Sequence, residues 1–315
     1  MKSFIRAKST LMTLGLSLST VATLATTAPA RDQIVLPKSA SFPESIAIDS
    51  AGGIYTGSVT LGNIIYLPAD GDAPKIFVEG GTNGAISIGG LLLSPQQSIL
   101  YACSSDLGLN SFSGSAAPGL LAFDVASGAL QKRWDLPGGG LCNDLAQGED
   151  GTIYVTDSFV PRILSLKPGA DAFESLVQDA RFSGEGFNLS GITILDDALI
   201  VAKFNSGQFF RIDLTSTPTV AQELQLSQPI YAPDGIRAVD GNGILVAASS
   251  GQVVHIEIDG LEAKVTPLDY AFDAPTSLAL HGEKIYVLEG QLNKLPAFDP
   301  TAVAPERFTI SVLPR

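Results

Sequence analysis

Six positions that recur along the chain carry mostly oxygen-bearing side chains. They are Glu44, Gly89, Asn143, Ser190, Asp234 and Thr276. Each lies two residues before the first apolar residue of a short segment in which apolar residues alternate. Carboxylate, amide and hydroxyl oxygens without Cys or His form the donor set of a hard cation. The pattern therefore predicts a binding site for Ca²⁺ or, as the second choice, Mg²⁺.

The same residue types have another explanation. Asp, Asn, Ser and Gly are common where strands begin, because their side chains bond to the local backbone. Glu44, however, has no such role after Pro43, and Asn143 and Asp234 stand in the same register as Glu44. Clustered carboxylates repel one another unless a cation or a proton intervenes. We therefore favour a metal site over a set of turn residues.

The segments that follow these positions are six copies of one unit. Their first apolar residues are at 46, 91, 145, 192, 236 and 278, separated by 45, 54, 47, 44 and 42 residues. This period is typical of a propeller blade with four short strands. The sequence predicts an all-β fold, a six-bladed β-propeller with four-stranded blades around a central channel. An open stack of β repeats is the second possibility and a two-domain chain the third.

Each repeat contains further β-rich runs bounded by Gly, Asp, Asn and Pro. Second strands are expected near 54–57, 99–102, 153–156, 199–202, 244–247 and 285–288. Third strands are expected at 63–67, 208–214 and 252–258, and fourth strands at 75–78, 130–136 and 307–313. The segment 33–36 precedes the first repeat and is expected to pair with the last blade. The insertion 106–118 is expected to form a surface loop over one mouth of the channel.

The first thirty residues have the pattern of a signal peptide. A basic head is followed by an apolar run over 11–24, and Ala28-Pro29-Ala30 supplies the small residues of a cleavage site. We expect an exported protein, periplasmic or secreted, with no stable membrane anchor after cleavage, and one propeller domain over 31–315. An uncleaved anchor is the less favoured alternative.

Composition excludes several partners and sites. Removal of residues 1–30 takes away three basic residues and no acidic ones, so the formal charge moves from −13 to −16. An acidic surface repels phosphate backbones, so we expect a small-molecule substrate and no nucleic acid. Cys103 and Cys142 are the two cysteines, without a C-x-x-C pattern. They could form a disulfide after export, but their spacing does not decide it. The oligomeric state is left open.

Three motifs, one per blade and in order, resemble a known group. They are Phe42-Pro43-Glu44, Asn143-Asp144 with the later 151–158 segment, and Pro233-Asp234-Gly235-Ile236. Together they resemble the gluconolactonase/regucalcin-like (senescence marker protein type) six-bladed propellers, which are relatives of the paraoxonase and diisopropylfluorophosphatase propellers. The resemblance covers essentially the whole of 31–315.

The resemblance implies a catalytic Ca²⁺ or similar ion held by Glu44, Asn143 and Asp234. The fourth ligand of the family is an Asn, but register here places Ser190 at that position, with Asn188 two residues upstream. Ser190 could ligate directly or through water, or Asn188 could reach in instead. This departure puts the strength of the site in doubt.

A site of this kind suits metal-dependent hydrolysis of a lactone or related ester. By the resemblance, Asp234 would act as general base or as nucleophile, and Asn143 would position the substrate oxygen. Asp157 and Ser158 would contact the substrate, with a turn-capping role as an equal alternative for Asp157. The alternative is a non-catalytic exported propeller that binds a small molecule or a protein around a structural ion. A Ser-His-Asp hydrolase is not indicated, because the sequence contains no G-x-S-x-G.

Overall fold

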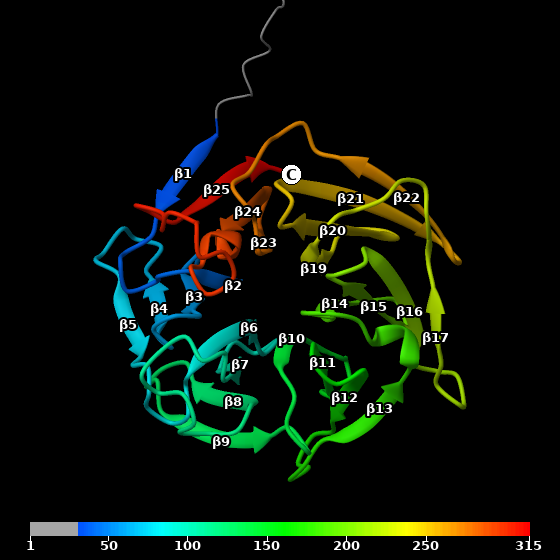
Figure 1. Cartoon of the computed structure of the whole chain (residues 1–315), viewed down its shortest axis with the longest axis horizontal. Helices are drawn as coiled ribbons and strands as arrows, with labels where there is room; N and C mark the ends of the chain where they lie inside the picture. Colours follow the sequence, from blue (N-terminus) through cyan, green and yellow to red (C-terminus); the bar gives the residue numbers. More distant parts are fainter. Residues whose placement is uncertain (1–30) are drawn as a thin grey trace, which may run out of the picture.

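The computed structural model describes residues 31–315, and the expected signal peptide lies outside the described residues. The chain forms six antiparallel sheets around a central axis (Figure 1). Both faces of every sheet are covered by its neighbours, which explains why the strands are rich in buried Ile, Leu, Val and Phe. The predicted six-bladed β-propeller is confirmed.

The blades follow one another in chain order, and the first strand of each lies nearest the axis (Figure 1). Blade 1 contains β2 (Pro43–Ile48), β3 (Ile54–Ser58), β4 (Ile64–Leu67) and β5 (Lys75–Val78). Blade 2 contains β6 (Ser87–Leu93), β7 (Ile99–Ser105), β8 (Gly119–Asp124) and β9 (Leu130–Asp135). Blade 3 contains β10 (Cys142–Gln147), β11 (Ile153–Asp157), β12 (Arg162–Leu166) and β13 (Glu174–Gln178).

The last three blades depart slightly from the simple pattern. Blade 4 contains β14 (Leu189–Leu195), β15 (Ala198–Lys203), β16 (Gln208–Asp213) and β17 (Ala221–Glu223). Blade 5 contains β19 (Pro233–Ala238), β20 (Gly243–Ala248), β21 (Gln252–Asp259) and β22 (Glu262–Pro267), with the short β18 (Gln225–Leu226) added in parallel to β22. Blade 6 contains β23 (Ser277–His281), β24 (Lys284–Glu289), β25 (Thr309–Pro314) and β1 (Asp32–Val35). Two 3₁₀ helices, η1 (Ala180–Phe182) and η2 (Leu292–Lys294), lie in loops.

Blade 6 is closed by both ends of the domain. β1 pairs antiparallel with β25 from Asp32 opposite Val312 to Val35 opposite Thr309. The expected pairing of segment 33–36 with the last blade is confirmed. The segment 307–313, however, supplies the third strand of blade 6 and not the fourth, because β1 takes the outermost place.

The core is divided among the spaces between blades. Of the described residues, six apolar clusters form, one in each space between neighbouring blades. Between blades 3 and 4, for example, Phe182 packs edge-on against Phe210 with the ring centroids 5.0 Å apart. Burial between sheets is the main stabilising force of the ring, at about 25 cal/mol per Å² of apolar surface removed from water. Within residues 31–315, no helix has the length and apolar character needed to cross a membrane.

Candidate functional site

A β-bulge interrupts the innermost strand of five blades at the same place. In blade 1 the register shifts between Pro43 and Ile46, so that Glu44 and Ser45 lie opposite one residue of β3. The corresponding shifts enclose 89–90, 143–144, 190–191 and 234–235. A bulge releases its residues from the regular ladder and re-aims their side chains. The bulges therefore position five of the six recurring residues that the sequence singles out. Together with Thr276 of blade 6 these residues surround the axis, and they are called the ring residues: Glu44, Gly89, Asn143, Ser190, Asp234 and Thr276.

The second residue of the bulge abuts the next blade, which limits its size. A Cβ on Gly191 would lie 2.1 Å from the carbonyl oxygen of Asp234. Only glycine allows so close an approach of two backbones. Blades 1 and 3 differ, with Ser45 and Asp144 at this place, and the Asp144 carboxyl group accepts hydrogen bonds from the backbone N–H groups of Leu145 and Ile192.

Backbone strain is concentrated at the same end of the inner strands. Phe42, Ala232 and Ala274 have left-handed φ angles of 47°, 51° and 46°, and each precedes a proline. Such conformations are unfavourable for residues with a side chain, by roughly 1–3 kcal/mol each, and they cluster at functional sites. Two of the three lie immediately before the Pro-Glu and Pro-Asp pairs of Glu44 and Asp234.

A cavity of about 450 Å³ lies at the axis above this ring. Five of the six ring positions line it: Glu44, Gly89, Asn143, Ser190 and Asp234. The sixth, Thr276, is fully buried, and its hydroxyl donates to the carbonyl oxygen of Pro43 at 3.3 Å. Leu107 from the 106–118 insertion also lines the cavity, which agrees with the expected position of that loop over one mouth.

The carboxyl groups of Glu44 and Asp234 lie in an unfavourable environment for negative charge. Burial, followed by the charges of Asp234 and Asp144, raises the pKa of Glu44 well above its ordinary value, while Arg237 acts in the opposite direction. Burial also raises the pKa of Asp234 to about 8, against the effect of a 3.2 Å hydrogen bond that Ser249 donates to Asp234 Oδ2. Within the described residues, neither carboxyl group has a basic partner.

Two oxygens of the ring residues have no hydrogen-bond partner among residues 31–315. They are Glu44 Oε2 and Asn143 Oδ1, and both are inaccessible to solvent. The hydroxyl oxygen of Ser87, which also lines the cavity, is unpaired as well. Buried polar atoms are almost always paired, so two unpaired acceptors beside two carboxyl groups point to a missing donor or cation. These oxygens fit a hard divalent cation.

The balance of charge near the axis also points to a divalent cation. Three carboxyl groups, Glu44, Asp144 and Asp234, lie near the axis, together with the guanidinium of Arg237. Arg237 Nη1 lies 3.0 Å from Asp144 Oδ2, which neutralises that carboxylate. Glu44 and Asp234 are left, and one divalent ion would balance them. Within residues 31–315 no three His, Cys, Asp or Glu form a ligand group, so a cation here would need amide or hydroxyl oxygens as well.

The structure places the two alternatives for the fourth ligand differently. Ser190 lines the cavity, and its hydroxyl donates to the carbonyl oxygen of Pro233 at 2.9 Å, which leaves its oxygen lone pairs as acceptors. Asn188 Oδ1 accepts a 3.0 Å hydrogen bond from Asn205, and its Nδ2 donates to the carbonyl oxygens of Ser158 and two glycines. Asn188 therefore holds loops together and lies outside the cavity lining.

Asp157 and Ser158 are fully buried and lie outside the cavity lining. The Asp157 carboxylate accepts hydrogen bonds from the backbone of Leu141 at 2.9 Å and pairs with Arg162 at 2.9 Å. Ser158 donates to the carbonyl oxygen of Leu189 at 2.5 Å. Asp157 therefore fixes the loop that precedes Cys142, and Ser158 joins blade 3 to the start of β14, so both residues have a structural part. Their contact with substrate stays a prediction without support from their position.

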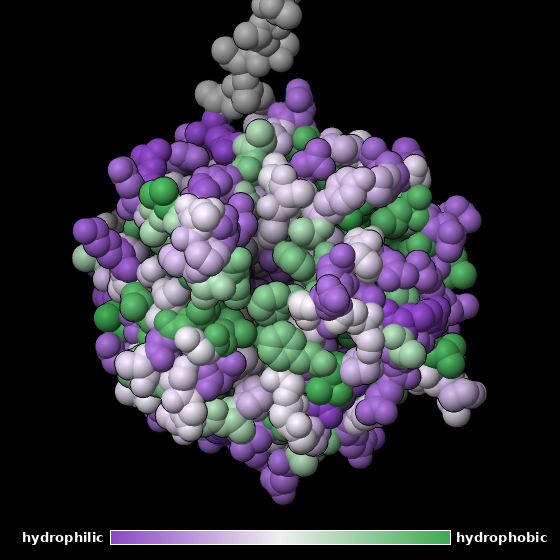
Figure 2. Space-filling view, in the orientation of Figure 1, coloured by the Kyte–Doolittle hydropathy of each residue, from purple (hydrophilic) through white to green (hydrophobic). Residues whose placement is uncertain are grey.

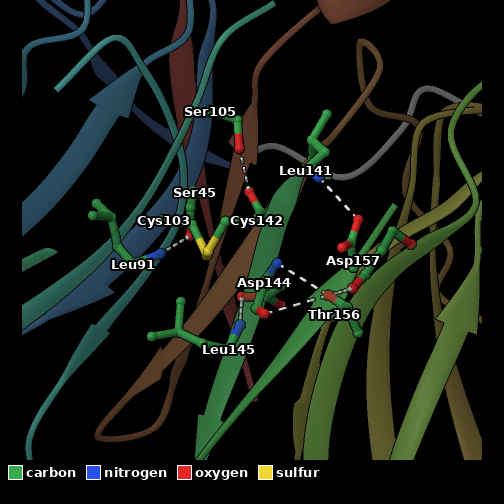
Figure 3. Close-up of a disulfide and its surroundings, with 11 residues drawn as sticks. Ser45, Leu91, Cys103, Ser105, Leu141, Cys142, Asp144, Leu145, Thr156 and Asp157 are labelled. Carbon is green, nitrogen blue, oxygen red and sulfur yellow. Dashed lines mark hydrogen bonds between the residues drawn. A yellow bond between two sulfur atoms is a disulfide. The ribbon is translucent and has the colours of Figure 1, made fainter. Parts of the chain in front are cut away.

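A disulfide joins Cys103 of blade 2 to Cys142 of blade 3, with the Cα atoms 5.2 Å apart (Figure 3). The sequence left this pairing open. Cys103 lies opposite the blade 2 bulge, and Cys142 immediately precedes Asn143. Ser105 donates to the carbonyl oxygen of Cys142 at 3.3 Å in the same place. The disulfide therefore fixes the backbone that carries Asn143.

Arg237 and Asp144 are functional candidates that the sequence reasoning did not assign. Asp144 stood beside Asn143 in the quoted motif, but nothing in the sequence showed a pairing across 93 positions. The one sequence feature that could have indicated a special role for Asp144 is its position in the repeat, because three other blades have glycine there.

Fold and site together define a six-bladed β-propeller with a polar site at one mouth of its axis. Solved structures of similar shape include a gluconolactonase from Xanthomonas campestris, with a TM-score of 0.63 at 13% identity over 90% of this chain and 90% of that chain. Virginiamycin B lyase from Staphylococcus aureus gives 0.58 at 13%, over 90% and 99%. The PQQ-bound aldose sugar dehydrogenase from Streptomyces coelicolor gives 0.59 at 14%, over 91% and 99%.

Gluconolactonase propellers are thus among the structural neighbours of this chain. No described protein family and no curated protein matches its sequence. At 13–14% identity, the likeness establishes the fold, and the three neighbours named carry three different chemistries on it. The activity therefore has to be argued from the site.

Proposed function

We propose that the protein hydrolyses a lactone or a related ester at the axial cavity, with a divalent cation, Ca²⁺ before Mg²⁺, as cofactor. The observation that carries the proposal is the grouping of two carboxyl groups without basic partners and an unpaired amide oxygen on the floor of a cavity with mainly apolar walls. Glu44, Asn143, Ser190 and Asp234 would hold the ion. When bound, such an ion supplies a Lewis acid that polarises a carbonyl oxygen.

Asp234 is the candidate general base. Ser249 donates a hydrogen bond to its Oδ2, which leaves the other carboxylate oxygen to accept a proton, and the residue lines the cavity. In the reaction, Asp234 takes a proton from water as the water oxygen bonds to the carbonyl carbon. The ester C–O bond then breaks, and Asp234 returns the proton to the leaving alkoxide, so that a hydroxy acid is formed. Asn143 orients the carbonyl oxygen, and the apolar walls exclude bulk water.

The positions of the two histidines argue against a histidine-dependent reaction like that of virginiamycin B lyase. A histidine-to-alanine variant of virginiamycin B lyase is catalytically inactive. This chain has two histidines, His255 in β21 and His281 at the end of β23, and neither lines the cavity. A histidine base is therefore not available at the axial site, which favours carboxylate chemistry.

A non-catalytic binding function is the second candidate. Ser190 stands where the resemblance predicts an Asn, and its hydroxyl proton is committed to Pro233. A weaker cation site would suit a structural ion that ties inner strands together while the cavity binds a small molecule.

The test is to titrate Ca²⁺ into chelator-stripped protein by calorimetry and to assay the same sample against lactones and aryl esters. Ca²⁺-dependent turnover supports the hydrolase. Ion binding without turnover supports the binding function, and absence of ion binding contradicts the metal site.

A further inference from the structure

The cavity is sharply divided between a polar floor and apolar walls. Among residues 31–315, its polar groups are the ring residues that line it, three serines at 87, 105 and 249, and Asn293, which is the one polar side chain beside the apolar walls. The walls above them are formed by Val59, Leu107, Phe187, Phe204, Leu292 and Phe298. These six residues come from the loops of blades 1, 2, 4 and 6, so the apolar wall is built by several independent segments.

The mouth carries an aromatic cluster that is not buried. Phe187 packs against Phe159 and against Phe298, with ring centroids 5.6 Å apart in both cases. Phe159 is 52% exposed and Phe298 46% exposed. Figure 2 shows hydrophobic residues gathered around the hollow at the centre of this face. Contiguous exposed apolar groups mark interaction sites, and at the mouth of a cavity they indicate a groove that binds a ligand, whereas singly scattered ones carry no such meaning.

The walls carry no charge and few hydrogen-bond donors. Among residues 31–315, Glu44 and Asp234 are the only charged side chains that line the cavity, and both lie on the floor. Within the same residues, no Lys or Arg lines the cavity to pair with the carboxylate of a sugar acid. A polyhydroxylated ligand would have to leave hydroxyl groups unpaired against Leu and Phe, and each such group is costly to bury.

We propose that the substrate is an amphiphile, a lactone or ester whose carbonyl end reaches the floor and whose alkyl or aryl body fills the apolar walls. This inference rests on the proposed function for the reaction, but its binding part does not depend on turnover. The cavity volume of about 450 Å³ is in the range of sites for compact organic ligands.

Two matched pairs of probes test the inference. The first is δ-decalactone against δ-gluconolactone as substrates, which share the six-membered ring and differ in tail and hydroxyl groups. The second is the corresponding pair of δ-lactams, which are resistant to hydrolysis, measured by calorimetry with the Ca²⁺-loaded protein. We expect the alkyl compound to be preferred in both pairs, and lactam affinity to rise about fourfold for each added methylene.

The variant Phe298→Ala should weaken binding of the alkyl lactam about tenfold, because it removes an apolar contact at the mouth. Val303→Ala is the control, since Val303 lies in the same segment, is 84% exposed and does not line the cavity.

The lactone and lactam measurements on the wild-type protein have distinct outcomes. Preferential binding of the alkyl lactam without any lactone turnover would support the inference and contradict the hydrolase. Hydrolysis that prefers δ-gluconolactone would overturn the inference and leave the hydrolase standing. Failure of both lactams to bind would also overturn it.

Discussion

Arg237 of blade 5 reaches past blade 4 to Asp144 of blade 3, where Nη1 lies 3.0 Å from Oδ2. The two side chains are 19% and 5% exposed, so the ion pair lies in the interior of the ring. Arg237 also lowers the pKa of Glu44, although burial and two neighbouring carboxyl groups outweigh it. The guanidinium thus offsets one of three carboxyl groups, and the remaining two define the charge that a cofactor must balance.

Arg237→Met should therefore destabilise the protein. Removing one partner of a buried ion pair leaves an unpaired charge, at a cost of about 3–5 kcal/mol. Adding Asp144→Asn to the same chain should restore part of this loss. The measurement is urea unfolding of both single variants and the double variant. Additive effects would show that the two residues do not act as a pair.

Asp234→Ala should abolish hydrolysis, with a loss of at least about 10²–10⁴-fold expected for a general base, and should weaken Ca²⁺ binding. The control is Asp269→Asn, because Asp269 is exposed and lies outside the cavity lining. Turnover and calorimetry on the three proteins provide the comparison. Wild-type turnover in Asp234→Ala would refute the assignment of this residue.

Ser190→Asn should strengthen Ca²⁺ binding several-fold, because it adds an amide oxygen at a position that lines the cavity. Asn188→Ser should instead lower stability with little change in Ca²⁺ affinity, since Asn188 bonds to surrounding loops. Calorimetry and thermal unfolding of both variants separate these effects. The opposite result would mean that Asn188 reaches the ion.

The stability of the metal-free protein should fall as the pH rises from 5 to 8. Asp and Glu in the unfolded chain ionise near pH 4. In the folded protein, burial raises the pKa of Asp234 to about 8 and raises the pKa of Glu44 well above its ordinary value. Between these values the folded state holds protons that the unfolded state has lost, so the free energy of unfolding decreases with pH. Asp234→Asn should flatten this slope. A chelator-treated sample with equal Tm at both pH values would contradict the prediction.

Removal of the disulfide with Cys103→Ala and Cys142→Ala together should cost roughly 3–4 kcal/mol, the value expected for a loop closed across 39 positions. Because Cys142 precedes Asn143, Ca²⁺ affinity should fall as well. Chemical unfolding and calorimetry measure the two effects, with reduced wild-type protein as a second test. Unchanged Ca²⁺ affinity would show that the inner strand of blade 3 holds Asn143 without the disulfide.

Repetition made the fold predictable. The residue two positions before each apolar segment falls on the ring because five inner strands have the same bulge. The sequence therefore located Glu44, Asn143 and Asp234 without revealing the bulge itself. The segment 307–313 was misplaced as a fourth strand, because only the closed ring shows that β1 takes the outer position.

Other features depend on neighbours that are distant in the sequence. The orientation of Asn188 is set by Asn205 and by carbonyl groups of two loops. The Arg237–Asp144 pair spans two blades. No local pattern encodes such contacts, because each partner alone has the appearance of an ordinary polar residue on a strand.

Neighbouring blades are also tied to one another near the axis. Thr156 Oγ1 donates to the carbonyl oxygen of Ser190, Ser190 Oγ to that of Pro233, and Thr276 Oγ1 to that of Pro43. Residues of the site therefore sit on a backbone that is held from both sides. Such support favours a site that is formed before its ligand arrives.

The pairing of β1 with β25 has a consequence for how the protein is made. β1 begins at Asp32, and its partner β25 ends at Pro314, after all the other strands of the propeller. The outer strand of blade 6 must therefore wait, without its partner, until the rest of the propeller has been synthesised. Contacts of such long range slow folding. A chain truncated before Thr309 would lose β25, the partner of β1, and the ring would stay open at blade 6.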